Sequence, residues 1–287
     1  MMGSKKNNTA IKDLEEISRQ IRGTLIGMSH KARAPHLGSA LSCIDILIAL
    51  HWKVMDNKSD LYGKRDKFII SKGHAASALY AALAFNGMIP MDLLDTYCEP
   101  GSDLEEHPGP RYLPGVEAAT GSLGHGLSLG AGIALADRLQ KQDNQVFVVI
   151  SDGECNEGSV WEAAMYASGQ NLKRLCAIID FNKWQATGRS CEVTGLEPLV
   201  KKWEAFGWHT LSVDGHNMKS LVNVLKKIHR KSDRPTAVIA HTVKGKGVSF
   251  MEDDNNWHYK IPSKEEVFLA KKELGVLKES PIEKKRA

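Results

Sequence analysis

Val146-Phe147-Val148-Val149-Ile150-Ser151-Asp152-Gly153 is the stretch that decides the fold, because an apolar run ends there in an acidic turn. A second apolar run, Leu175-Cys176-Ala177-Ile178-Ile179, ends in the turn Asp180-Phe181-Asn182-Lys183-Trp184. Short apolar runs bounded by polar turns predict buried parallel strands. The segment 158–167 between them carries apolar residues at helical spacing. Together these segments predict one strand–helix–strand unit.

Polar residues follow both predicted strands at the point where each strand ends. The carboxyl ends of neighbouring parallel strands lie side by side, so we expect Asp152 and Asn182 together at the rim where such sheets bind ligands. Carboxylate, amide and carbonyl oxygens suit Mg²⁺ or Ca²⁺, with water and phosphate oxygens completing the coordination. Gly153 lets the backbone approach a bulky anion. Either turn taken alone is explained as well by an ordinary loop.

The rest of the chain alternates predicted helices and strands. Apolar residues recur at helical spacing from Leu14 to Met28. Further helices are predicted over 44–52, 75–86, 127–140 and 220–231, and further strands over 67–71, 210–213 and 236–241. This order predicts an α/β fold with a doubly wound, mainly parallel sheet flanked by helices. We expect a flexible N-terminus over 1–10, one domain over 11–262 and a charged C-terminal tail over 263–287.

Composition excludes several classes of function. A chain of 287 residues that is 42% hydrophobic and 25% charged is typical of a globular protein. The net charge of +4 is too small to indicate a nucleic-acid partner. The sequence has no long uncharged apolar run, so we expect no membrane association and a cytoplasmic location. The cysteines form no Cys-x-x-Cys pair, so neither a disulfide framework nor a zinc site is predicted.

The turn at Asp152-Gly153, followed thirty positions later by Asn182, resembles the diphosphate-binding motif of thiamine diphosphate enzymes, with Ser151 in place of the usual first glycine. Further segments resemble transketolase segments in the same order: 31–39, 65–75, His107-Pro108 with 113–117, 120–126, 213–216, and 242–247 with Trp257-His258. Several blocks in the right order are far more specific than any one of them. The chain therefore resembles the amino-terminal half of a split transketolase.

The resemblance implies a thiamine diphosphate site with a divalent cation, Mg²⁺ or alternatively Ca²⁺ or Mn²⁺. The implied metal ligands are Asp152, Asn182 and the backbone carbonyl of Trp184. The implied cofactor contacts come from segments across the chain: His74, Gly121, Ser122, Leu123, Asp152, Gly153, Glu154, Asn182 and His258. Such an enzyme must anchor the diphosphate, deprotonate the thiazolium carbon and move protons on substrate hydroxyls. This chain supplies the first need and part of the third.

The resemblance also implies catalytic roles for three histidines and two glutamates. His36, His107 and His258 match substrate-channel histidines, a residue type whose ordinary pKa lies near the working pH. Glu157 and Glu162 match glutamates that lie at the subunit interface of transketolases, where neighbouring carboxylates can share a proton. Burial habits alone favour an exposed helix position for Glu162. The roles of His125 and His216 stay undecided.

The glutamate that protonates the aminopyrimidine ring belongs, in this family, to a second domain. We therefore expect the chain to be catalytically incomplete without a C-terminal-half transketolase subunit that carries the pyrimidine-binding domain, in an α2β2 heterotetramer. The implied reaction moves a two-carbon ketol unit from a ketose or ketose-phosphate donor to an aldehyde acceptor. Two alternatives remain open: the alpha subunit of a 2-oxo acid dehydrogenase, and a non-catalytic subunit that retains the fold.

Overall fold

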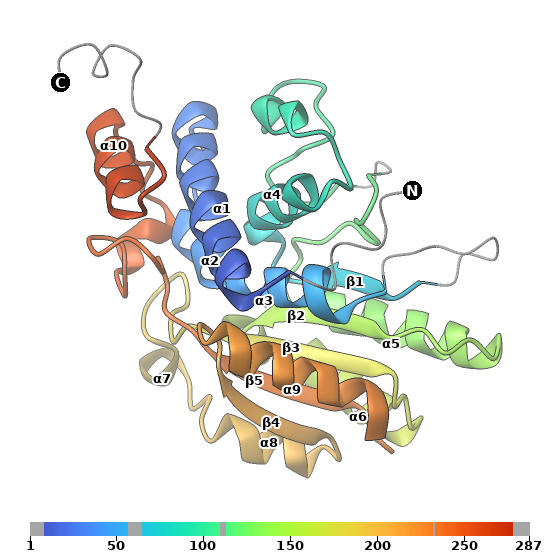
Figure 1. Ribbon diagram of the computed structural model, residues 1–287. Coiled ribbons are helices and arrows are strands. Elements are labelled where there is room, and N and C mark those ends of the chain that lie inside the picture. The colour runs from blue at the N-terminus through green and yellow to red at the C-terminus, as the bar shows by residue number, and fades with distance from the viewer. Residues whose placement is uncertain (1–8, 57–64, 110–112, 232, 278–287) are drawn as a thin grey trace, which may run out of the picture.

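The computed structural model describes residues 9–56, 65–109, 113–231 and 233–277. Within them, five parallel strands form one sheet in the order β1-β2-β3-β5-β4 (Figure 1). The strands are β1 (Lys67–Ile70), β2 (Val146–Ser151), β3 (Leu175–Phe181), β4 (His209–Asp214) and β5 (Thr236–His241). Every pair of neighbouring strands is parallel. The predicted parallel α/β sheet is confirmed.

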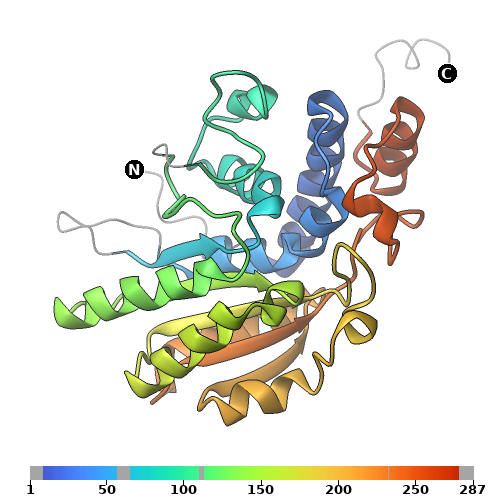
Figure 2. The same ribbon diagram turned by 180° about the vertical axis from the view of Figure 1, so that it is seen from behind.

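Helices cover both faces of the sheet. One face packs against α1 (Ile11–Ala32), α2 (Leu37–Ser42), α3 (Ile44–Ala49), α4 (Ala76–Asn86) and α9 (Met218–Lys231). The other face packs against α5 (His125–Leu139), α6 (Gly158–Gly169) and α8 (Leu199–Ala205). In Figure 1, α9 lies in front of the sheet, whereas the reverse view in Figure 2 has α5 and α6 in front. This is the predicted doubly wound arrangement.

The two cores follow from the alternation of side chains along each strand. Phe147 and Val149 of β2 belong to the core beneath α1 to α4, and Val148 and Ile150 belong to the core beneath α5 and α6. Every residue of β2 and β3 is buried. A strand covered on both faces needs a continuous apolar run, which is why these two strands were the clearest in the sequence.

Two helices differ in detail from the prediction. The single helix expected over 44–52 is α3, which ends at Ala49 and continues as a π-helical turn, Leu50–Val54. The helix expected from Ala75 starts with a 3-10 turn, Gly73–Ala75, before α4 begins. Both differences lie at helix ends, where short-range hydrogen bonds compete and the side-chain pattern says little.

The C-terminal segment contributes a helix that packs on the domain. Helix α10 (Lys264–Glu273) begins with a capping box in which Ser263 and Glu266 satisfy each other's backbone N–H groups. It packs against α1, and Ala270 and Leu274 are buried in the first core. The expected charged tail therefore starts as a docked helix, and residues 278–287 lie outside the described part of the chain. Most of the expected flexible N-terminus also lies outside it. No helix in the described residues is long and apolar enough to cross a membrane.

Candidate active site

The predicted carboxylate ligand and the amide ligand lie at the carboxyl ends of adjacent strands. Ser151 of β2 pairs with Asp180 of β3, so Asp152 and Asn182 follow side by side. Ser190 connects them, because its hydroxyl donates to Asp152 Oδ2 at 2.7 Å and its backbone N–H donates to the carbonyl of Lys183 at 3.0 Å. Burial raises the pKa of Asp152 to about 7. A cation bound at this carboxylate would compensate its buried charge.

The loop after β3 brings the other two predicted ligands together. The Oδ1 atom of Asn182 accepts the backbone N–H of Trp184 at 3.0 Å, which is an Asx turn. This turn places the peptide of Trp184 beside the amide of Asn182. With Asp152, the site offers one carboxylate, one amide oxygen and one backbone carbonyl, a set that fits Mg²⁺ or Ca²⁺. No cluster of three or more His, Cys, Asp or Glu arranged for a metal occurs in the described residues, so the site is not of the zinc type.

Glu154 braces the metal turn from within the protein. Its buried carboxylate accepts the N–H of Ser151 at 2.8 Å, the N–H of Gly124 at 3.0 Å and the hydroxyl of Ser71. Burial raises the pKa of this carboxyl, against the effect of its donors. Because the side chain already joins three segments, only the backbone of Glu154 is left for the expected cofactor contact.

The loop that contains Gly121, Ser122 and Leu123 is held by close packing. A Cβ atom on Gly73 would lie 2.7 Å from the backbone nitrogen of Gly121. Gly121 itself has φ 147°, and a Cβ there would lie 3.0 Å from the ring of His107. Helix α5 begins just after this loop, so its free N–H groups face the same region. The glycines thus set the loop directly beside the histidines.

The histidines expected to contact cofactor or substrate gather in one cluster. The ring centroid of His36 lies 5.5 Å from that of His74, 6.0 Å from that of His107 and 4.9 Å from that of His258. Burial lowers the pKa of His258 to about 3 and holds that of His74 well below its ordinary value. Both rings are therefore neutral near pH 7, and each keeps one nitrogen free of a proton.

His36 differs from its neighbours in its backbone and in its partner. Its φ is 68°, which is uncommon for a residue other than glycine, and its N–H donates to the carbonyl of His258 at 2.8 Å. Its Nδ1 atom lies 3.1 Å from a carboxylate oxygen of Glu106. Burial lowers the pKa of His36, and the charge of Glu106 acts in the opposite direction. Left-handed backbone of this kind is concentrated at functional sites.

A buried charged pair to which the sequence assigned no role lies beneath the site. Lys72 donates to Asp180 Oδ2 at 2.5 Å and to the carbonyl of Ser39 at 2.9 Å. The hydroxyls of Ser42 and Thr242 also donate to Asp180, at 2.6 Å and 2.5 Å. Burial acts against the charge on Lys72, but the carboxylate of Asp180 outweighs it and raises the lysine pKa. One signal was available, because Asp180 extends a strand predicted to be buried and a buried charge needs a partner.

Lys244 places a second cation against the histidine cluster. Its buried ammonium group lies 2.7 Å from Asn255 Oδ1 and 3.3 Å from His258 Nδ1. Burial lowers the lysine pKa to about 8, so the side chain is mainly charged at pH 7. The sequence placed Lys244 in a family-like segment but gave no reason to expect it at the histidines. A charge here favours an anionic ligand.

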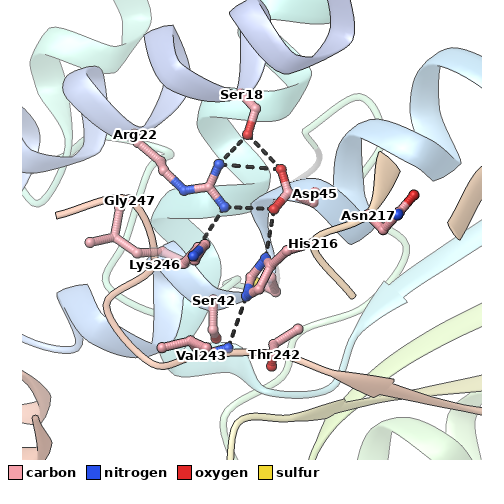
Figure 3. A network of polar contacts seen from close by, with 12 residues as sticks. Ser18, Arg22, Ser42, Asp45, His216, Asn217, Thr242, Val243, Lys246 and Gly247 are labelled. Carbon is pink, nitrogen blue, oxygen red and sulfur yellow. Dashed lines mark hydrogen bonds and ion pairs between the residues drawn. The ribbon is translucent and has the colours of Figure 1, made fainter. Parts of the chain in front are cut away.

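His216, which the sequence left undecided, belongs to a structural network (Figure 3). Its Nδ1 atom lies 2.7 Å from Asp45 Oδ2, and its Nε2 atom accepts the N–H of Val243 at 2.8 Å. Arg22 pairs with the same carboxylate at 2.8 Å. Since Nε2 accepts a hydrogen bond, the ring proton resides on Nδ1. His216 thereby holds the backbone next to Lys244. His125 is exposed, and its Nδ1 atom lies 3.3 Å from the carbonyls of Ser122 and Leu123, in its own turn.

Glu157 and Glu162 lie on the surface, apart from the buried histidines. Glu157 directly precedes α6 and Glu162 lies in its first half, and both are exposed. Neither side chain is enclosed by this chain. Their expected role at a subunit interface stays a prediction.

Comparisons with known proteins agree with this geometry. The family described as transketolase, thiamine diphosphate binding domain, matches residues 15–285. One of the two subunits of an apulose-4-phosphate transketolase, from Phocaeicola vulgatus, is 40% identical over 92% of this chain and 95% of that protein. A 6-deoxy-6-sulfo-D-fructose transketolase subunit from Clostridium sp. is 41% identical over 84% of this chain and 88% of that protein.

The solved structures show the same fold in longer proteins. The transketolase of Campylobacter jejuni superimposes with a TM-score of 0.86 at 27% identity, over 93% of this chain. This chain spans 43% of that protein. From the family match, the relatives and the shared fold, the chain belongs to the transketolase family, in which it corresponds to the thiamine diphosphate-binding domain.

Proposed function

We propose that this chain is the diphosphate-binding subunit of a two-subunit transketolase. The enzyme moves a two-carbon ketol unit from a ketose or ketose-phosphate donor to an aldehyde acceptor. The observation that carries the proposal is the gathering of His36, His74, His107 and His258 in one cluster beside Lys244, whose charge also acts on Asp152. The family match and the names of the relatives favour this function over that of a 2-oxo acid dehydrogenase.

The residues divide between anchoring and proton transfer. Asp152, Asn182 and the carbonyl of Trp184 would hold Mg²⁺, with Ca²⁺ or Mn²⁺ as alternatives. The loop 121–123, Gly153 and His74 would contact thiamine diphosphate, which when bound supplies an electron sink for the carbon that loses its substituent.

The remaining histidines act on substrate hydroxyls. Neutral His258 can accept a hydroxyl proton near pH 7, because burial keeps its pKa at about 3. His36 can hold a proton more readily than a ring without a carboxylate partner, since Glu106 stabilises its charged form. His107 lies at the edge of the same cluster and completes the substrate contacts.

A separate partner subunit is the second part of the proposal. Helices α5 and α6 lie together on the face shown in Figure 2. They carry exposed apolar side chains, with Leu129 at 42%, Leu139 at 72%, Met165 at 56% and Tyr166 at 46%. Exposed apolar groups that gather on one face are typical of protein interfaces. Glu162 lies on α6 with them, which fits its expected place between subunits of an α2β2 assembly.

The substrates are proposed only by class. The names of two relatives specify apulose-4-phosphate and 6-deoxy-6-sulfo-D-fructose, so the donor differs among close relatives. We propose a ketose or ketose phosphate as donor and an aldehyde as acceptor. The cytoplasmic location expected from the sequence stays a prediction.

The decisive experiment is an assay of ketol transfer with purified proteins. We expect the chain with thiamine diphosphate and Mg²⁺ to be inactive alone and active with its partner subunit. Robust turnover by the chain alone would refute the split site, and pyruvate-dependent dye reduction by the pair would favour the dehydrogenase alternative.

A variant of the metal ligand tests the non-catalytic alternative. Asp152→Ala should abolish metal-dependent binding of thiamine diphosphate by the pair, because it removes the carboxylate ligand. Asp143→Ala, at an exposed surface position, is the matched control and should bind normally. Unchanged binding by Asp152→Ala would contradict the metal assignment and favour a subunit that has lost the chemistry.

A further inference from the structure

Three side chains join the loop that carries the predicted metal ligands to the loop that leads to His258. Arg189 donates to both oxygens of Asp253, each at 2.6 Å. The indole N–H of Trp184 donates to Asp253 Oδ1 at 2.8 Å. The guanidinium carbon of Arg189 lies 3.8 Å from the centre of the Trp184 ring. We call Trp184, Arg189 and Asp253 the latch.

The latch closes a loop whose two ends both contact the metal site. The loop starts at Asn182, whose side chain accepts the N–H of Trp184, and ends at Ser190, whose hydroxyl donates to Asp152. Backbone pairing between Trp184 and Arg189 forms the neck of the loop. Movement of Arg189 would therefore be passed to Ser190 on one side and to the Trp184 peptide on the other.

The opposite loop ties the latch to the histidine cluster. Asn255 donates to the carbonyl of Ala186 at 3.1 Å and accepts from Lys244 at 2.7 Å. His258 follows in the same 3-10 turn, Asn255–His258. The latch thus fixes the distance between the metal ligands and the residues that face the substrate.

The chemistry of the latch is specific for its residue types. A bidentate pair with a carboxylate and stacking on an indole both require the planar guanidinium of arginine, which lysine lacks. The carbonyl of Trp184 is the proposed metal ligand, so its side chain is free to serve as the point of attachment. The Arg189 and Asp253 side chains are 30% and 53% exposed, and a pair this exposed adds little to global stability. Its effect is instead local, on the conformation of the loop.

We propose that Trp184, Arg189 and Asp253 are positioning residues for the divalent cation. They hold the loop 182–190 in its ligand-binding conformation before the cation arrives. The inference rests on the proposed function, because it takes Asp152, Asn182 and the Trp184 carbonyl as the metal ligands.

The test measures the binding of Mn²⁺ by the full chain in the presence of thiamine diphosphate, with free Mn²⁺ determined by electron paramagnetic resonance. Asp253→Asn and Arg189→Lys should each raise the dissociation constant for Mn²⁺ about 10-fold, as expected for partners that orient metal ligands. The double variant should be no weaker than either single one, because each single change already opens the latch. Arg174→Lys, in a comparably exposed pair with Asp143, is the matched control and should bind as the wild type does.

The outcomes separate the latch from the metal site itself. Thermal midpoints of both latch variants should stay close to that of the wild type, which excludes a general loss of folding. Mn²⁺ affinities within twofold of the wild type in both latch variants would overturn the inference, provided that Asp152→Ala binds no Mn²⁺. Full binding by Asp152→Ala would instead overturn the metal assignment in the proposed function.

Discussion

The substitution Lys72→Met tests the buried charged pair beneath the candidate site. The side chains of Lys72 and Asp180 are both 0% exposed. Methionine keeps most of the aliphatic volume but removes the ammonium group, so the carboxylate of Asp180 is left in the core without a counter-charge. Breaking such a pair costs about 3–5 kcal/mol. Because Ser42 and Thr242 still donate to Asp180, we expect the lower value, about 3 kcal/mol.

The assay is unfolding of the full chain by urea and by heat at pH 7. For a domain of this size, 3 kcal/mol corresponds to a fall in the thermal midpoint of roughly 6–12 °C. Adding Asp180→Asn removes the uncompensated charge and should restore at least half of the lost stability. Arg174→Met, which breaks an exposed pair, should cost under about 1 kcal/mol. The reasoning fails if Lys72→Met matches this control, or if the double variant is no more stable than the single one.

Two further substitutions probe the same region. The folded-state pKa of His258, about 3, lies below its ordinary value of 6.5, so the unfolded chain binds the proton more tightly and stability is lost as the pH falls from 6.5 toward 3. His258→Gln should therefore lose less stability than the wild type between pH 7 and 4.5, by about 1 kcal/mol after allowance for solvent screening; equal losses in urea titrations would contradict this. Gly245→Ala places a Cβ 2.1 Å from the Met251 carbonyl at φ 76°, and should cost more than about 2 kcal/mol. Gly87→Ala, also at φ 76° but with no atom within 4 Å, should cost only about 1 kcal/mol in the same assay.

Helix and strand positions could be read from local patterns, and the places where they could not have a common cause. The boundaries of β5 match the prediction, because six consecutive buried or turn-flanked residues leave little choice. The split of 44–54 into α3 and a π-helical turn depends on packing, since these residues are apolar almost throughout. A uniformly apolar segment carries no periodicity that fixes its hydrogen-bond pattern.

The candidate site shows the same division. Asp152 and Asn182 were placed together from sequence, since parallel strands must end at one rim. The inward turn of the Glu154 carboxylate was not foreseen, because its three donors come from two distant segments as well as its own turn. The latch was also unforeseen, since Asp253 lies 64 positions from Arg189. Residue types in a motif indicate chemistry, but they do not indicate which way a side chain points.

The sequence by itself determined the parallel α/β fold, the metal-binding turn and the family to which the chain belongs. These features are local, because strand burial and turn chemistry act over a few residues. Only the tertiary structure decided that His36, His74, His107 and His258 form one cluster, that Lys72 neutralises Asp180 and that Lys244 faces His258. Such contacts join segments far apart in the chain. Their energy comes from burial and charge pairing in the packed state, and no pattern along the chain records it.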